Sequence, residues 1–341
     1  MNEIYVHGIG AVSPAGWSVT TLREVFNKGE PLPTKELSRP GWTRSLLVRQ
    51  VPVANPRPAF LNHPRLRRTS PISQFAFAAA LEAIGEDAKQ IGSHRLGVIF
   101  CVMSGCINYS KRFYDETLKD PATASPLVFP ETVFNAPSSH LAAALGTTAR
   151  NYTLVGDPGT FLQGLALAAD WLTADAVDAC VVVGAEEMDW LLTDAFRLFD
   201  RKYLMSEGAG ALYLKPAAQS VNSESSVRLA AVTDAHLFTN NQSRAEAARK
   251  MRAQLPSSAN ALLCDGLQGL SKIDSPETTA WSDWRGTKLS PKRLLGEGSM
   301  AAAAWQCVAA VDALHQNSYA AANVSVVGCN QQAIGARFEK V

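Results

Sequence analysis

Residues 151–172 read NYTLVGDPGTFLQGLALAADWL, which predicts a strand, a tight turn and a helix in direct succession. We expect residues 151–155 to form a short buried strand and residues 161–172 to form a helix. A turn of this kind presents its residues at a helix N-terminus, where the helix dipole and free N–H groups stabilise negative charge on a nucleophile. Here the turn is Asp157-Pro158-Gly159, and proline has no reactive atom.

Apolar strands alternate with helices along the rest of the chain. The expected strands are residues 4–10, 96–102 and 177–184, and the expected helices are residues 68–84 and 138–145. Continuous apolar strands that alternate with helices indicate a sheet covered on both faces. The sequence therefore predicts an α/β protein.

The second half of the chain repeats the order of the first. A helix at residues 164–173 and strands at 178–184 and 209–214 have counterparts in a helix at 300–314 and strands at 324–328 and 334–338. We therefore expect two similar α/β halves, residues 1–218 and 219–341, which share one core. The join falls in the polar stretch QSVNSESS, residues 219–226.

Composition limits the classes of function. The chain has 341 residues, 47% of them hydrophobic, and its 32 basic and 31 acidic residues give a net charge of +1. No overall field therefore favours nucleic acid or an anionic membrane. No leader pattern or long apolar run occurs, so we expect neither export nor a membrane span. The six cysteines lack paired spacing, which predicts no metal site and a cytoplasmic protein with reduced thiols.

Six segments, in order, resemble the β-ketoacyl synthase branch of the thiolase-like family. They are YVHGIGAVSPAG (5–16), HPRLRRTSPISQFAFAAALEA (63–83), SPLVFPETVFNAPSSHLAAALG (125–146), NYTLV with its turn and helix (151–172), VVVGAEE (181–187) and LFDRKYLMSEGAGALYL (198–214). The resemblance covers essentially the whole chain. It implies a thiolase-like fold, in which two similar α/β halves pack as α-β-α-β-α layers.

The family uses a cysteine to carry the acyl chain, two histidines to drive decarboxylation of a malonyl thioester, and a supporting lysine. The resemblance places the cysteine at Pro158 and the histidines at Asp265 and Glu297, while the lysine is kept as Lys292. Proline cannot act as the thiolate, and ionised carboxylates would repel the malonyl carboxylate and the enolate. We therefore expect no catalytic residue at these positions.

Such a chain resembles a chain-length factor, a pseudoenzyme that forms a heterodimer with an active ketosynthase and shapes its acyl tunnel. The expected interface comprises Asn151, Tyr152, Thr153, Leu154 and Val155 with the 129–140 region, including Phe134 and His140. Residues 106–115 would approach the partner's tunnel, and the loop Gly328-Cys329 would lie near the former pocket. The substrate would be an acyl chain on an acyl carrier protein, in polyketide, aryl polyene or fatty acid biosynthesis.

Other interpretations stay open. Asp265, Glu297 and Lys292 form either a structural ion pair or the acid and base set of a repurposed enzyme acting on acyl thioesters. A homodimeric scaffold that binds acyl chains is a further alternative. The acyl chain, the pathway and the choice between homodimer and heterodimer are not encoded in any motif.

Four smaller features of the sequence also bear on function. Arg65, Arg67 and Arg68 form either a docking patch for an acidic carrier protein or a solvated helix lead-in. Gly8-Ile9-Gly10 lacks the third glycine of a dinucleotide-binding turn, so we expect no cofactor. Cys101 and Cys106 are expected to be structural. The histidines (His7, His63, His94, His140, His236 and His315) do not fall on the family's catalytic positions.

Overall fold

The computed structural model describes residues 3–64, 66, 68–93, 95–217, 226–258, 260–316 and 318–341. The strands of its main sheet are β1 (Ile4–Val12), β4 (Leu96–Val102), β5 (Asn151–Val155), β6 (Ala179–Glu186), β8 (Gly208–Pro216), β9 (Val227–Val232), β10 (His236–Leu237), β11 (Ala261–Cys264), β12 (Thr287–Leu289), β13 (Ala321–Val327) and β14 (Gln332–Lys340). Their order is β12-β11-β13-β14-β9-β1-β8-β6-β4-β5, with β10 on β14. A small second sheet contains β2 (Lys35–Leu37), β3 (Leu46–Arg49) and β7 (Met205–Ser206).

The main sheet is a repeat of one five-strand pattern. In the first half, β4 pairs in parallel with β5 and β6, and β8 pairs antiparallel with β6 and β1. In the second half, β11 pairs in parallel with β12 and β13, and β14 pairs antiparallel with β13 and β9. The half-sheets meet where β1 pairs with β9. The predicted pair of similar α/β halves is confirmed, but residues 218–225 lie outside the described part, so the boundary stays a prediction.

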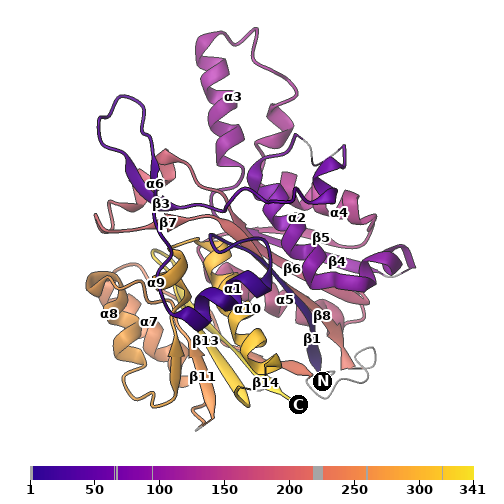
Figure 1. The fold of residues 1–341 in the computed structure, drawn as a ribbon. Helices are drawn as coiled ribbons and strands as arrows, with labels where there is room; N and C mark the ends of the chain where they lie inside the picture. The colour runs from indigo at the N-terminus through magenta and orange to yellow at the C-terminus, as the bar shows by residue number, and fades with distance from the viewer. Residues whose placement is uncertain are drawn as a thin grey trace.

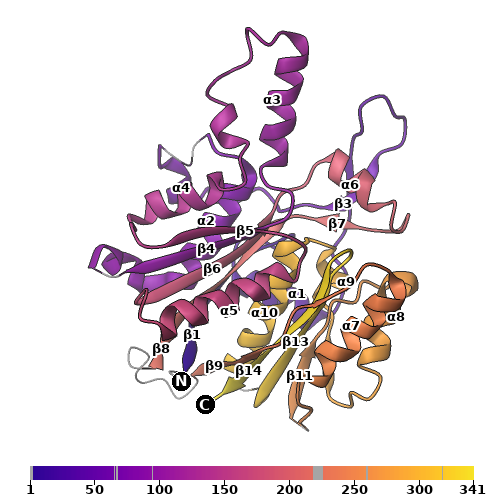
Figure 2. The ribbon, with the colours of Figure 1, turned by 180° about the vertical axis from the view of Figure 1, so that it is seen from behind.

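Helices form three layers around the two half-sheets, whereas α3 projects away from them (Figure 1 and Figure 2). The helices are α1 (Val19–Lys28), α2 (Pro71–Ile84), α3 (Ile107–Lys119), α4 (Ala136–Leu145), α5 (Thr160–Thr173), α6 (Trp190–Phe196), α7 (Asn241–Ala253), α8 (Ser271–Ala280), α9 (Pro291–Leu295) and α10 (Met300–His315), with 3-10 turns η1 (Ala59–Asn62), η2 (Gly85–Ser93) and η3 (Phe129–Glu131). Helices α5 and α10 contact strands of both half-sheets, α2 packs on β1, β6 and β8, and α7 packs on β13 and β14. This gives the expected α-β-α-β-α layers.

The central layer lies close to the sheet because its contact residues are small. Gly184 of β6 and Gly210 of β8 lie beneath α10. A Cβ added at Gly184 would come within 2.7 Å of the Met300 carbonyl oxygen, and one added at Gly210 would come within 2.7 Å of the Ala304 Cβ. The alanine-rich start of α10 and these glycines together allow the helix to approach the first half-sheet closely. One buried apolar cluster around α10 draws residues from both halves.

Two predictions about individual elements were wrong. Strand β5 has the predicted bounds but is largely exposed, because it ends the strand order and pairs, among the described strands, with β4 alone. The helix predicted from residue 68 begins at Pro71, since proline favours the first position of a helix.

None of the described helices combines the length and hydrophobicity that crossing a bilayer requires.

Candidate functional site

The turn Asp157-Pro158-Gly159 directly precedes helix α5, and hydrogen bonds to the side chain of Asp157 hold it in place. The Asp157 carboxylate accepts hydrogen bonds from the Gly159 N–H at 3.1 Å and from the backbone and side-chain amides of Gln332 at 3.1 and 3.0 Å. The N-cap residue of α5 is Gly159, so these hydrogen bonds hold the turn that directly precedes the helix. The positive end of the α5 dipole therefore faces a carboxylate from the same chain.

The loop after β13 covers this turn. A Cβ on Gly328 would lie 1.9 Å from Oδ2 of Asp157, so the loop can approach this closely only with glycine. The Gly328 N–H donates to the Gln332 carbonyl at 2.8 Å. The neighbouring Cys329 is partly exposed, but burial and the nearby carboxylates of Glu297 and Asp157 raise the pKa of its thiol to about 12. Cys329 is therefore a poor source of thiolate.

Lys292 and Glu297 form a buried ion pair. The Lys292 Nζ donates to Oε2 of Glu297 at 2.7 Å, and both side chains are 3% exposed. Glu297 also accepts from the Gln268 amide at 2.9 Å and from the Ser299 N–H at 2.7 Å. Burial lowers the pKa of Lys292, but Glu297 and Glu277 outweigh this effect, so the pKa lies above its ordinary value. The pair is charged and hydrogen-bonded at both carboxylate oxygens.

Asp265 follows β11 and has different partners. Its carboxylate accepts from the Leu267 N–H at 3.3 Å and hydrogen-bonds to Ser290. Among the described residues, no ion pair joins it to Lys292. Burial raises the pKa of Asp265, and burial together with Asp265 raises the pKa of its neighbour Glu277 to about 7.

Four of the predicted positions lie around one closed pocket. Its lining includes Pro158, Lys292, Glu297 and Cys329, but not Asp265. The free space among these side chains is about 10 Å³, close to what one water molecule requires. Side chains that sequence reasoning missed fill the rest, namely Phe196, Tyr203, Arg244, Gln268 and Glu277. They come from segments far apart in the chain, and no local motif marks them.

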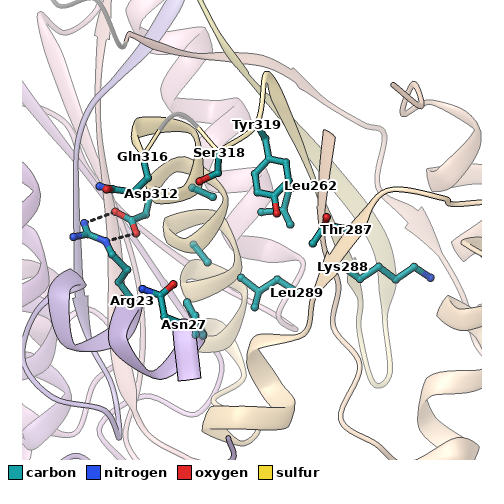
Figure 3. A pocket seen from close by; sticks show the side chains of 13 residues that line it. Arg23, Asn27, Leu262, Thr287, Lys288, Leu289, Asp312, Gln316, Ser318 and Tyr319 are labelled. Carbon is teal, nitrogen blue, oxygen red and sulfur yellow. Dashed lines mark hydrogen bonds and ion pairs between the residues drawn. The ribbon is translucent and has the colours of Figure 1, made fainter. Parts of the chain in front are cut away.

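A larger cavity lies elsewhere, between α1, α10, β11 and β12, with a volume of about 560 Å³ (Figure 3). It shares no lining residue with the closed pocket. Its charged wall is the pair of Arg23 and Asp312, joined by two hydrogen bonds of 2.7 and 2.6 Å. The Lys288 Nζ reaches the Trp281 carbonyl at 3.4 Å, and in Figure 3 this side chain points away from the Arg23 wall. The arrangement offers no nucleophile with an adjacent base.

The expected interface residues lie on an exposed edge and a projecting segment. On β5, Tyr152 is 52% and Val155 54% exposed. The segment of residues 103–135, here called the arm, carries α3 and extends away from the sheet (Figure 1 and Figure 2). The large apolar side chains that the arm exposes are Tyr114, Leu118, Leu127, Phe129, Val133 and Phe134.

The base of this surface is fixed by polar contacts. The Asn151 amide donates to the Ser138 carbonyl at 3.2 Å and joins β5 to α4. The His140 Nε2 lies 2.9 Å from both carboxylate oxygens of Glu131 and joins α4 to the arm. Thr153 and Leu154 are half-buried on β5.

The remaining sequence candidates are separate from the pocket. Arg68 is exposed, whereas Arg65, Arg67 and His94 lie outside the described residues. Cys101 and Cys106 are buried, and burial raises the pKa of both thiols. Within the described part of the chain, no group of histidine, cysteine or carboxylate side chains is arranged to hold a metal ion.

Comparisons with known proteins agree with this architecture. The family model "Beta-ketoacyl synthase, N-terminal domain" matches residues 1–220. Three solved structures, each 16% identical, cover 99–100% of this chain and of their own. They are a type II polyketide ketosynthase bound to its acyl-carrier protein and a hexaketide (TM-score 0.80), the ishigamide ketosynthase/chain length factor (0.80) and a β-ketoacyl synthase from Burkholderia phymatum STM815 (0.82). A search of curated proteins found no match.

Proposed function

The chain belongs to the β-ketoacyl synthase family, and we propose that it is a non-catalytic member that pairs with an active ketosynthase and shapes its acyl tunnel. The observation that carries this proposal is the closed pocket. Around Pro158, Lys292 and Glu297 the free space is about 10 Å³, whereas an acyl chain requires a cavity many times larger. A chain with this pocket acts through its surface.

The chemistry of the pocket also favours a non-catalytic role. A condensing enzyme needs a thiolate that takes up an acyl group and neutral donors that stabilise an enolate. Pro158 supplies no nucleophile, and the nearest thiol, Cys329, has a raised pKa. The Glu297 carboxylate is already neutralised by Lys292 and hydrogen-bonded by Gln268 and Ser299. These contacts support a structural ion pair.

The exposed edge of the sheet supports a protein partner. An edge strand presents unpaired backbone groups, and natural proteins protect such edges with charges, bulges or a partner. Strand β5 instead exposes Tyr152 and Val155, and the adjacent arm exposes several further apolar side chains. In our proposal a ketosynthase subunit covers β5 and the arm, including Phe134, with His140 fixing the arm at its base.

The proposed substrate is an acyl chain on an acyl carrier protein, held covalently by the partner's cysteine. One similar structure contains a ketosynthase with its acyl-carrier protein, and another is a ketosynthase/chain length factor. We propose that this chain likewise acts as a chain length factor and works with an acyl carrier protein. The pathway would be polyketide, aryl polyene or fatty acid biosynthesis in the cytoplasm. Arg68 is exposed near α2 and would attract an acidic carrier.

The experiment is a decarboxylation and condensation assay on the purified chain with malonyl and acyl carrier proteins. We expect no carbon dioxide release above the rate without protein. Turnover by the chain alone, lost in Glu297→Gln and kept in the surface variant Glu246→Gln, would favour the repurposed enzyme instead. A tight homodimer that carries bound acyl chains would favour the scaffold alternative.

A further inference from the structure

An apolar cavity lies beside the first turns of α2, apart from the closed pocket and from the cavity between α1 and α10. Its volume is about 310 Å³, and none of its lining residues lines either of the other two. Among its lining residues, only Arg57 and Gln74 have charged or amide side chains, and the others are aliphatic or aromatic. A cavity of this size, with apolar walls and few polar groups, is typical of a small-molecule site.

The walls present carbon atoms to the cavity. Trp17 and Phe75 pack edge to face, with their ring centroids 5.6 Å apart. The Trp17 indole N–H donates to the Pro52 carbonyl at 2.7 Å, so the one donor of this ring is already used. Leu61 is 6% exposed, whereas Val53 is 94% exposed. An apolar molecule in the cavity would cover part of Val53 and remove further apolar surface from water.

Arg57 brings a positive charge to these walls without a counter-charge. Its Nη2 donates to the Leu61 carbonyl at 3.5 Å, the outer limit of a hydrogen bond. The arginine ion pairs in the described part of the chain all involve other arginines. Gln74 is uncharged, and its amide donates to the Thr69 carbonyl at 3.3 Å. The guanidinium is therefore free to bind an anion.

The sequence around the cavity is basic. Residues 37–81 contain no aspartate and no glutamate. The arginines of this stretch are Arg39, Arg44, Arg49, Arg57, Arg65, Arg67 and Arg68. Arg39 pairs with Asp194, and Arg49 donates to the Leu32 carbonyl at 2.7 Å. The local field at Arg57 thus attracts an anion and repels a cation.

We propose that this cavity binds a small carboxylic acid with an apolar, ring-bearing body, whose carboxylate pairs with Arg57 while the ring packs against Trp17 and Phe75. The guanidinium fork matches a carboxylate with parallel hydrogen bonds, and such charge-assisted bonds are about twice as strong as neutral ones. Aromatic walls favour a ring over a flexible chain, because rings pair edge to face or offset. The site goes beyond the proposed function, since it shares no residue with the closed pocket, β5 or the arm.

The test uses hydrocinnamate and its neutral amide, hydrocinnamamide, as probes of the purified chain. Selective nitrogen labelling of tryptophan gives an NMR signal for each indole N–H, and Trp17→Phe identifies the signal of Trp17. We expect hydrocinnamate to shift this signal saturably. The amide should bind at least about tenfold more weakly, because it lacks the charge that Arg57 recognises.

The matched variants are Arg57→Gln and Arg249→Gln. Arg57→Gln should weaken hydrocinnamate binding at least about tenfold and leave the binding of the amide unchanged. Both arginines are exposed, so neither change should affect the fold, and circular dichroism checks this. Arg249 likewise contacts a backbone carbonyl, that of Ala245 at 3.4 Å, but lies on α7. Arg249→Gln should therefore bind hydrocinnamate like the wild type.

The absence of a saturable shift at Trp17 would overturn the site. Equal affinity for the acid and the amide would indicate an uncharged occupant, and it would also overturn the proposal. An unchanged affinity in Arg57→Gln, or an equal loss in both arginine variants, would remove the assigned role of Arg57. Partner assembly is measured separately, so none of these results decides the proposed function.

Discussion

Pro158 occupies the helix start at which this family is expected to hold its nucleophile, and the surrounding residues suit proline. The Asp157 carboxylate accepts from the Gly159 N–H in the turn before α5, and Gly328 leaves room for it. A cysteine placed at this position would therefore meet a negative charge where an active enzyme offers a free helix N-terminus.

This predicts that Pro158→Cys gives an unactivated thiol. We expect a thiol pKa at or above the ordinary value near ~8.5, because Asp157 opposes formation of the thiolate. The measurement is the pH dependence of iodoacetamide labelling. Labelling of the wild type gives the contribution of Cys329, which is subtracted. Adding Asp157→Asn should lower the thiol pKa, and rapid labelling of Pro158→Cys alone well below neutral pH would refute this account.

The Lys292 and Glu297 pair predicts a large effect on stability. Glu297→Gln leaves a buried ammonium without its counter-charge, so we expect a loss of about 3–5 kcal/mol in the free energy of unfolding. Chemical denaturation measures the loss. The double variant Lys292→Met/Glu297→Leu should recover part of it, because no charge then remains buried. A loss below about 1 kcal/mol in Glu297→Gln would contradict a structural pair.

At the scale of elements, the sequence predicted the existence of most central strands and helices but not their environment. Strand β5 reads as buried because Thr153, Leu154 and Val155 are apolar or β-branched, and both an edge and a central strand use such residues. Its exposure depends on the strand order, which no local pattern encodes. Residues 106–115 of the arm and the 129–140 region were assigned to a partner-facing surface, but helix α3 itself was not predicted. The small sheet was missed because β2, β3 and β7 have only three, four and two residues, too few for a periodic pattern.

The exposed edge predicts that Val155→Lys weakens association with the partner by at least about tenfold, because lysine on an edge strand opposes strand pairing and burial. The side chain is 54% exposed, so the fold of the isolated chain should be unaffected. Leu237→Lys, at an exposed apolar position of β10, is the matched control. Co-purification with the partner and circular dichroism of each variant provide the comparison, and equal loss in both variants would contradict a specific role for β5.

At the scale of the whole molecule, the buried carboxylates make stability depend on pH. The pKa of Glu186 is raised to about 8 and those of Glu207 and Glu277 to about 7, chiefly by burial. A carboxyl group whose pKa is raised by folding keeps its proton up to a higher pH in the folded state than in the unfolded state. Its stabilising contribution is therefore complete below about pH 4.5 and is lost as pH rises to about 8.

We accordingly expect the thermal unfolding midpoint to fall between about pH 6 and about pH 8.5. Differential scanning fluorimetry across this range measures the change. Glu277→Gln should reduce the slope, because the amide oxygen still accepts from the Gly266 N–H while no proton is released. A midpoint that rises with pH would contradict the assigned protonation states.

The sequence also predicted the repeated halves, because helix α5 and helix α10 are each followed by strands with a similar apolar pattern. It brought Pro158, Lys292, Glu297 and Cys329 to one site through the family resemblance. The closure of that site was not predictable, since Tyr203 and Gln268 contribute from segments with no motif of their own. Asp265 was grouped with Lys292 by motif position, whereas its hydrogen bonds go to Leu267 and Ser290.

The most direct test of a non-catalytic subunit is its assembly with an active ketosynthase. The measurement is native mass spectrometry of this chain after co-expression with a ketosynthase encoded beside it. We predict a one-to-one heterodimer that carries the acyl group on the ketosynthase cysteine alone. Two stable proteins that do not associate, or an acyl group attached to this chain, would contradict the account.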